Sequence, residues 1–377
     1  MDESNAQQIS DNHVDDHVDD EIKFCLSEAN HRSFFMFAGA GSGKTRSLIN
    51  ALTFIDNEMG LKLSTHFKQV AVITYTNAAC DEISKRLQYK PIFAVSTIHS
   101  FLWGLIESHQ RDIRDWIIES LNKDISELRE KQSSGRGGDA SIRREAEIAK
   151  KNARLAKIAT IKKFSYDPNG ENAGYDSLSH SEVVKMGSEF IATEETMQEI
   201  LISKYPILLI DESQDTKKEL VAALLTVYEK YKDRFVIGMF GDTMQRIYLD
   251  GKDNLDICIP DDWNKPVKVM NHRSSTRIVE LANAIRQTID DKMQRPRSDV
   301  GVGTVRLFIA DDSAIKEDVE LRVAQMMAKL ANDNEWLNSA NYKSLILEHH
   351  MAASRFGFLD LYVPLHESKC FETSLLS

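Results

Sequence analysis

The stretch Phe34-Phe-Met-Phe-Ala-Gly-Ala-Gly-Ser-Gly-Lys-Thr45 decides the fold. Its five apolar residues, 34–38, predict a buried strand, and the glycines that follow predict a loop tight enough to wrap a phosphate group. Apolar side chains at helical spacing over 44–55 then predict a helix, whose N-terminus attracts anions. This order of strand, glycine loop and helix is typical of a P-loop nucleotide-binding site.

We expect this loop to bind the phosphates of ATP. Its residues are Ala38, Gly39, Ala40, Gly41, Ser42, Gly43, Lys44 and Thr45, with Ala38 at the position of the usual first glycine. Lys44 would reach the β- and γ-phosphates, and the Thr45 hydroxyl would bind Mg²⁺. A glycine turn that happens to precede Lys-Thr is the alternative, but it does not account for the strand and helix on either side.

A second stretch, Leu208-Leu-Ile-Asp-Glu-Ser-Gln-Asp215, places two carboxylates at the end of another buried-type strand. Parallel α/β sheets bind ligands at the carboxyl ends of their strands, so these groups should lie near the phosphate loop. Asp211 would hold Mg²⁺ through water, and Glu212 would act as the general base on the attacking water. An acidic loop after a strand is common, but beside a phosphate loop it indicates hydrolysis.

Two further polar blocks are candidates. Gln245, after a third strand, is placed to hydrogen-bond the γ-phosphate or its water. Arg273, in Asn-His-Arg-Ser, could act across a domain cleft as an arginine finger. Alone, either block would more often be a surface cluster than a site.

The alternation of strands and helices continues along the chain. Apolar runs predict strands at 34–38, 70–74, 93–96, 207–210 and 235–240, and helical spacing predicts helices at 78–87, from about 98, and at 218–231. Strands that are apolar along their whole length are typical of a parallel sheet covered on both faces. The predicted fold class is α/β: a P-loop NTPase with RecA-like parallel sheets, helices on both faces and a helical insertion.

We predict four parts. They are an acidic disordered tail at 1–22, a first RecA-like motor domain at 23–107 and 204–266, a helical accessory insertion at 108–203, and a partial second RecA-like domain at 267–377. In the last part we expect helices at 275–290 and 315–331, and strands at 303–309 and 344–348. No further strand–helix cycle follows, so this unit is predicted to be incomplete.

The net charge of −11 does not exclude DNA binding, because binding follows local patches. Residues 1–22 hold eight acidic residues and no Lys or Arg, and subtracting them leaves about −3. Residues 129–163 hold eleven Lys and Arg against four acidic residues, which suits a surface that tracks DNA phosphates or a solvated helix face. The repeat His-Val-Asp-Asp at 13–20 suits a metal site or, as composition favours, a solvated arm.

The cysteines and the hydropathy indicate the compartment. Cys25, Cys80, Cys258 and Cys370 are far apart in sequence, as is typical of free thiols in a reducing compartment. No apolar run approaches the roughly 18 to 20 residues that span a bilayer, and the N-terminus does not resemble a secretory signal. We expect a cytoplasmic protein with no membrane partner.

Six blocks together resemble the UvrD/Rep family of superfamily-1 DNA helicases in order and spacing. They are the phosphate loop through Arg46, TYTNAA at 74–79, STIHSF at 96–101, DESQD at 211–215, GDTMQRIY at 241–248 and NHRS at 271–274. The resemblance covers about residues 34–280, and a later block with Arg355 is similar to one in the second motor domain. It implies two RecA-like domains with ATP between them, and 3′-to-5′ movement on single-stranded or partly duplex DNA.

The resemblance also assigns roles to single residues. Arg46 and His272 would sandwich the adenine, although the family commonly has Tyr in place of His272. Tyr75 would stack on a DNA base, unless it is an ordinary aromatic at a strand end. The remaining residues in blocks that touch the DNA strand are Asn77, Thr97 and His99.

The chain departs from the family in three places. Gln7 and Gln8 are too isolated to assign as the glutamine that reads adenine, and Leu249-Asp250 stands where the family often has Trp-Arg. No block similar to H-x-A-K-G-L-E closes the second motor domain. We therefore expect either a fragment of a longer polypeptide or a chain that a partner completes.

Two functions remain open. The first is an ATP-dependent DNA translocase or helicase, of a type that also occurs in bacterial anti-phage defence. The second is a regulatory subunit of a defence or repair complex, which binds ATP and DNA to regulate a partner, such as a nuclease, with little unwinding of its own.

Overall fold

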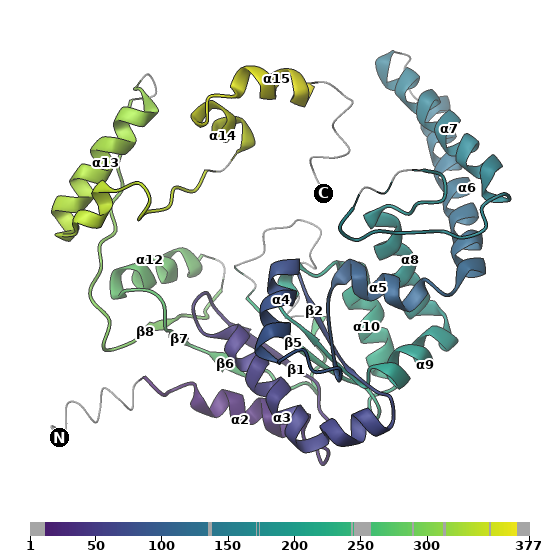
Figure 1. Cartoon of the computed structure of the whole chain (residues 1–377), viewed down its shortest axis with the longest axis horizontal. Coiled ribbons are helices and arrows are strands. Elements are labelled where there is room, and N and C mark those ends of the chain that lie inside the picture. Colours follow the sequence, from purple (N-terminus) through teal and green to yellow (C-terminus); the bar gives the residue numbers. More distant parts are fainter. Residues whose placement is uncertain are drawn as a thin grey trace. The chain divides into compact units, whose positions relative to one another are not determined.

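The strands between residues 34 and 268 form a six-stranded parallel sheet (Figure 1). The computed structural model describes residues 12–134, 138–170, 172, 174–242, 244, 258–288, 290–311, 314–346 and 348–367. The strands, in the order β3-β2-β4-β5-β1-β6, are β3 (Phe93–Thr97), β2 (Val70–Thr74), β4 (Ile207–Ile210), β5 (Val236–Gly241), β1 (Phe34–Ala38) and β6 (Val267–Lys268). All neighbouring strands are parallel, so the predicted fold class is confirmed.

Both faces of the sheet are covered, and its strands β1, β2, β4 and β5 are buried at every position. Along β1, Phe35 and Phe37 enter one hydrophobic cluster, while Phe34 and Met36 enter the other, since successive side chains of a strand point to opposite faces. One face packs against α2 (Asp16–Leu26), α3 (Lys44–Thr65) and α4 (Asn77–Arg86). The other packs against α5 (Ile98–Ile106), α8 (His180–Thr193), α9 (Glu195–Lys204) and α10 (Lys218–Lys230).

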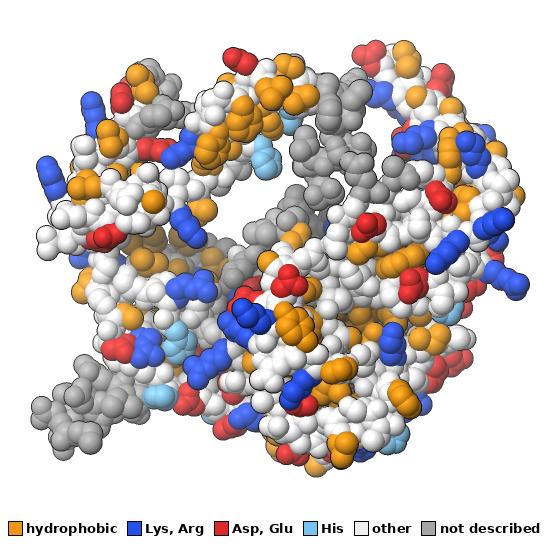
Figure 2. All heavy atoms as spheres, viewed as in Figure 1, with side chains coloured by type: hydrophobic (Ala, Val, Ile, Leu, Met, Phe, Trp, Pro, Cys, Tyr) orange, Lys and Arg blue, Asp and Glu red, His pale blue; other side chains and the backbone are white. Residues whose placement is uncertain are grey.

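The predicted insertion is helical, but only part of it projects from the sheet. Helices α6 (Gln110–Ser134) and α7 (Asp139–Ile158) form a hairpin, whereas α8 and α9 belong to the layer that covers the sheet. Lys151 and Arg154 of the hairpin are paired with acids: Lys151 Nζ lies 2.6 Å from an Asp124 oxygen, and Arg154 Nη1 lies 2.5 Å from a Glu182 oxygen. Figure 2 shows Lys and Arg side chains interspersed with acidic ones there. The limits 108–203 and the DNA-tracking role stay predictions.

The acidic tail contains a helix that packs on the core. Val18, Ile22, Cys25 and Leu26 of α2 are all buried, at the spacing of one helix face. The prediction that 1–22 is disordered was therefore wrong for 16–22, because this apolar stripe outweighs the flanking aspartates. Residues 1–11, with Gln7 and Gln8, lie outside the described residues.

The carboxylates of this segment bind other parts of the sheet edge. Asp15 accepts hydrogen bonds from the backbone N–H groups of Val269 (3.1 Å) and Met270 (2.8 Å). Asp19 lies 2.9 Å from Lys268 Nζ and accepts a hydrogen bond from Ser47 Oγ at 2.6 Å. Within the described part of the chain, no group of three or more His, Cys, Asp and Glu residues could hold a metal ion. The alternative of a metal site in this repeat gains no support.

The chain divides into two compact units, one formed by 1–274 and 282–299 and the other by 275–281 and 300–377. Val267, where we predicted the second domain to begin, lies in β6 of the main sheet. The first unit also contains a small parallel pair, β7 (Met270–Asn271) and β8 (Arg295–Pro296). Helix α12 (Thr276–Arg286) begins in the second unit and ends in the first.

The strands predicted late in the chain are wrong. Residues 303–309 and the described residues of 344–348 carry no strand. Leu307, Ile309 and Leu345 are almost fully exposed, so these apolar runs have no partner strand to pair with. The second unit instead contains α13 (Lys316–Ala331), η3 (Asn334–Leu337), α14 (His349–Arg355) and α15 (Leu359–Glu367). The domain limits themselves stay predictions.

Two smaller expectations concern thiols and membranes. Cys25, Cys80 and Cys258 are free, and Cys370 lies outside the described residues. In the part of the chain that the structure describes, no helix has the length and apolar character needed to cross a bilayer.

Candidate nucleotide-binding site

The phosphate loop is a tight turn between β1 and α3. Gly41 has a φ of 73° and Gly43 a φ of 86°, in the left-handed region that glycine adopts without strain. Ser42 closes the turn, because its Oγ donates a hydrogen bond to the Gly39 carbonyl at 2.7 Å. Lys44 then begins α3, so the positive end of a long helix meets the loop.

Ala38 fits the position where the motif usually has glycine. It is the last residue of β1, it is buried, and its φ is not positive. Its carbonyl accepts a hydrogen bond from Lys44 Nζ at 3.2 Å. Since the position contributes a backbone oxygen in an ordinary extended conformation, a methyl side chain is tolerated there.

The predicted lysine and general base meet across the strand ends. Lys44 Nζ, on a buried side chain, lies 3.7 Å from Glu212 Oε2. Glu212 is the second residue after β4 and has a φ of 47°, a conformation that costs a non-glycine residue on the order of 1 kcal/mol. The strained turn therefore lies where the carboxylate meets the lysine.

Thr45, Asp211 and Glu212 line one cavity of about 380 Å³, together with Gln214 and other residues. Burial, and then the charge of Glu212, raise the pKa of Asp211 to about 6. A bound cation would offset both effects. The Thr45 hydroxyl and the Asp211 carboxylate are hard oxygen ligands of the kind that Mg²⁺ prefers, so these two residues fit the expected ion.

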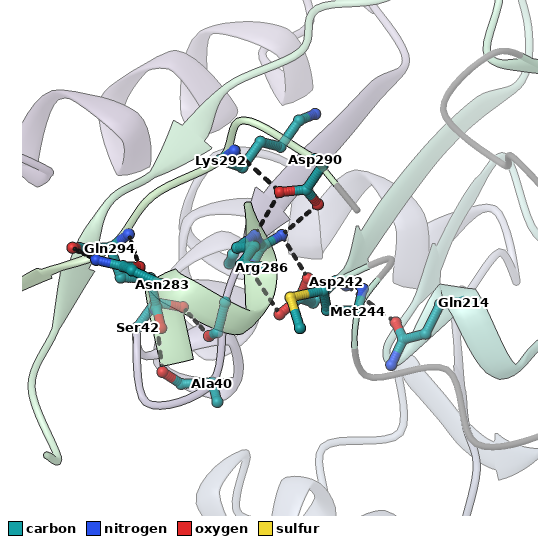
Figure 3. Close-up of polar contacts among 12 residues, drawn as sticks. Ala40, Ser42, Gln214, Asp242, Met244, Asn283, Arg286, Asp290, Lys292 and Gln294 are labelled. Atoms are coloured by element: carbon teal, nitrogen blue, oxygen red, sulfur yellow. Dashed lines mark hydrogen bonds and ion pairs between the residues drawn. The ribbon is translucent and has the colours of Figure 1, made fainter. Parts of the chain in front are cut away.

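The third strand end joins the same site through Gln214. The Gln214 side chain donates from Nε2 to Glu212 Oε2 at 2.9 Å. Its Oε1 accepts from the backbone N–H of Asp242 at 3.1 Å, the contact that Figure 3 shows. Asp242 directly follows β5. Gln245, like Leu249 and Asp250, lies outside the described residues, so its contact with the γ-phosphate stays a prediction.

The Asn-His-Arg-Ser block lies against the phosphate loop. Asn271 Nδ2 donates to the Ala40 carbonyl and the backbone N–H of His272 donates to the Gly41 carbonyl, both at 2.9 Å. A methyl group placed on Gly41 would come within 2.9 Å of Arg273 Cβ. The structure thus brings Arg273 to the loop, while its role as an arginine finger stays a prediction.

Arg46, one of the two residues expected to sandwich adenine, is among the charges that act on the pKa of the other, His272. Burial lowers the pKa of His272, and the positive charges of Arg297, Lys268 and Arg46 lower it further, against the opposing effect of Asp15. Arg46 follows the phosphate loop on α3, so both side chains belong to the same end of the site. The sandwich itself stays a prediction.

The four residues expected to contact DNA lie at or just after the carboxyl ends of β2 and β3, which are neighbours in the sheet. Thr74 pairs with Thr97 in register, so the segments after β2 and β3 start side by side. Tyr75 is 39% exposed and lines the same cavity as Asp211. Thr97 has a structural task that the sequence reasoning missed, because its hydroxyl caps α5 by accepting from Ser100 N–H at 3.3 Å.

Asn77 and His99 contact the segment between α7 and α9. Asn77 Nδ2 donates to Asn169 Oδ1 at 2.7 Å, and the His99 ring lies 5.0 Å from the His180 ring. Burial, and then the charges of His180 and Lys217, lower the pKa of His99 to about 4. These side chains therefore already have protein partners, and their contact with DNA stays a prediction.

Four polar residues at this site were not expected: Asn283, Arg286, Asp290 and Gln294. The sequence contains only a weak indication that one of them, Arg286, lies at the site. Arg286 lies seven residues after the buried Val279 on α12, so a charged side chain occupies the same helix face as a buried apolar one.

Comparison with known proteins agrees with this geometry. The fold and the site define a P-loop nucleotide-binding protein. Residues 23–250 match the family described as AAA domain, and because that match covers more than half of the chain, the chain belongs to this family.

Two curated relatives share most of the chain. It is 28% identical over 403 residues to Gabija protein GajB of Bacillus cereus (strain HuB5-5), covering 89% of this chain and 58% of the relative. It is 25% identical over 343 residues to Gabija protein GajB of Bacillus cereus (strain VD045), covering 87% of this chain and 60% of the relative. The chain therefore spans less than two thirds of the length of these relatives.

Proposed function

We propose that this chain is a cytoplasmic ATP hydrolase that couples Mg²⁺-dependent hydrolysis of ATP to movement on single-stranded DNA, as UvrD/Rep-like helicases do. The observation that carries the proposal is the 3.7 Å approach of Lys44 Nζ to Glu212 Oε2, beside the cavity that Thr45 and Asp211 line. Membership of the AAA domain family supports nucleotide binding.

Each residue has a defined task in this mechanism. Backbone N–H groups of the phosphate loop bind the phosphates, and Lys44 neutralises charge on the β- and γ-phosphates. Because Lys44 is buried, its attraction for the phosphates is stronger than it would be in water. Glu212 accepts a proton from the attacking water. Thr45 and Asp211 would hold Mg²⁺, which when bound stabilises negative charge on the phosphates.

The coupling to DNA would run through Tyr75. This side chain lines the cavity that contains Asp211, so a base stacked on it would lie next to the hydrolytic residues. Stacking on an aromatic ring contributes about 1–3 kcal/mol per base and tolerates any sequence. A motor that moves along DNA of varied sequence requires this tolerance.

We further propose a role in anti-phage defence, which the similarity to two proteins named Gabija protein GajB supports. A second candidate function is an ATP- and DNA-sensing subunit that regulates a partner such as a nuclease. The observation that favours it is that the described residues of 300–367 carry no strand.

Single-turnover ATP hydrolysis, with and without single-stranded DNA, separates the two functions. The tested variant is Glu212→Gln, and Glu219→Gln, on the exposed face of α10, is the matched control. DNA-stimulated hydrolysis that disappears only in Glu212→Gln supports the motor. Nucleotide-dependent DNA binding without turnover supports the sensing subunit, and a chain that binds no nucleotide contradicts both.

A further inference from the structure

A buried arginine joins two carboxylates beside the nucleotide site. Arg286, near the end of α12, is 6% exposed. Its guanidinium binds Asp242 through two contacts, Nη2 to Oδ1 at 2.8 Å and Nη1 to Oδ2 at 3.3 Å (Figure 3). It also binds Asp290, with Nε 2.6 Å from Oδ1 and Nη2 3.0 Å from Oδ2. Both carboxylates are therefore fixed in direction by one planar group.

From Asp242, a chain of hydrogen bonds leads to the general base, Glu212. The backbone N–H of Asp242 donates to Gln214 Oε1, which leaves Gln214 Nε2 directed at Glu212 Oε2. The packing here is close, since a methyl group on Gly241 would lie 2.9 Å from Gln214 Oε1. A shift of Asp242 would therefore move the donor that orients Glu212.

A second chain of hydrogen bonds starts from Asn283 on the same helix and leads to the phosphate loop. Asn283, one turn before Arg286 on α12, donates to the Gln294 carbonyl at 2.8 Å and accepts from the Gln294 N–H at 2.9 Å. Gln294 Nε2 in turn donates to the Ala40 carbonyl at 3.0 Å. Residues of one helix, Asn283 and Arg286, thus connect to both the phosphate loop and the glutamine that contacts Glu212; Figure 3 shows Asn283 and Arg286 with Gln294, Asp242 and Gln214.

Stability alone is a poor reason to bury these charges. Removing an arginine and two carboxylates from water costs as much free energy as their attraction returns, and apolar residues of similar volume often stabilise a core better. A fixed direction for Asp242 is what a planar, two-pronged contact provides and an apolar contact does not.

We propose that Arg286 is a positioning residue for ATP hydrolysis: by fixing Asp242 it holds Gln214 in the orientation that aligns Glu212 with the attacking water. This inference rests on the proposed ATP hydrolase function. Its consequence is a loss in kcat without a loss in nucleotide affinity, because Lys44 and the phosphate loop keep their own contacts.

The test compares steady-state ATP hydrolysis of the full chain in Arg286→Lys, Arg286→Gln and the double variant Arg286→Gln with Asp242→Asn. The double variant removes both charges of the pair, so no unpaired charge is left on Asp242 to unfold the protein. Arg277→Gln, an exposed arginine on the same helix, is the matched control. Thermal unfolding and binding of a fluorescent ATP analogue are measured for each variant.

We expect kcat to fall about tenfold or more in both variants that carry Arg286→Gln, with KM and analogue affinity unchanged. Arg286→Lys should recover part of kcat, because it restores charge but not the two-pronged contact. An unchanged kcat in the folded double variant overturns the inference, and so does a fall in kcat that merely follows lower affinity and a lower Tm. If the wild-type chain hydrolyses no ATP, the proposed function itself fails.

Discussion

Lys44 and Glu212 lie far apart in sequence, yet the lysine Nζ is 3.7 Å from the carboxylate Oε2. We predict that Lys44→Met lowers ATP hydrolysis about a hundredfold, because the positive charge nearest the transferred phosphate is removed from a buried site. Lys62→Met, an exposed lysine on the same helix, is the control. Equal hydrolysis rates in the two variants would contradict the assigned role of Lys44.

The backbone strain at Glu212 predicts a separation of stability from activity. Glu212→Gly should raise the free energy of unfolding by about 1 kcal/mol relative to Glu212→Gln, because glycine adopts a φ of 47° without strain. Both variants should lose hydrolysis, since both lack the carboxylate. Urea unfolding together with ATPase assays checks this, and a less stable glycine variant would show that the turn carries no strain.

The alanine at position 38 predicts a mild phenotype. Ala38→Gly keeps the carbonyl that accepts from Lys44, so hydrolysis should change little, while the free energy of unfolding should fall by about 0.5–1 kcal/mol. Gly41→Ala should instead abolish nucleotide binding, because its methyl group would lie 2.8 Å from Asn271 Oδ1 at a positive φ. Isothermal calorimetry with an ATP analogue and chemical unfolding distinguish the two outcomes.

His99 predicts a pH dependence of stability. Its pKa in the folded chain is about 4, below the ordinary value of 6.5, so between these values the unfolded chain binds a proton that the folded chain does not. Its contribution to stability is thus complete above about pH 6.5 and is lost as the pH falls toward 4. The Tm of His99→Gln should fall less over this window than that of wild type.

The matched control for that experiment is the exposed His66→Gln. Its Tm should follow the wild-type curve. If His99→Gln also follows the wild-type curve, His99 does not titrate differently in the folded chain.

The central fold could be predicted from sequence because its information is local. Each central strand is a mostly apolar run. The glycine loop marks the end of β1, and the acidic pair Asp211-Glu212 marks the end of β4. Helix α2 was missed, since an acidic repeat hides the stripe of Val18, Ile22 and Cys25. The prediction of a strand at 303–309 was wrong for the opposite reason. An apolar run becomes a strand only beside a partner strand, and Leu307 is almost fully exposed.

The site was predictable to the same extent. Lys44, Thr45, Asp211 and Glu212 occupy motifs whose position relative to a strand end is fixed, and the structure brings them together. The contact of Gln294 with Ala40 of the phosphate loop joins residues that are far apart in sequence, so no local sequence pattern predicts it. Gln214 lay within a recognised motif, but only the packing against Asp242 shows what its side chain binds.

The binding of Asp15 and Asp19 to Lys268 and its neighbours has a practical consequence for protein production. A shortened protein that starts at residue 23, trimmed on the assumption that everything before it is dispensable, would remove the carboxylate of Asp19 from Lys268 and uncover the apolar side of α3. Such a product should aggregate, whereas one that begins at residue 12 should stay in solution.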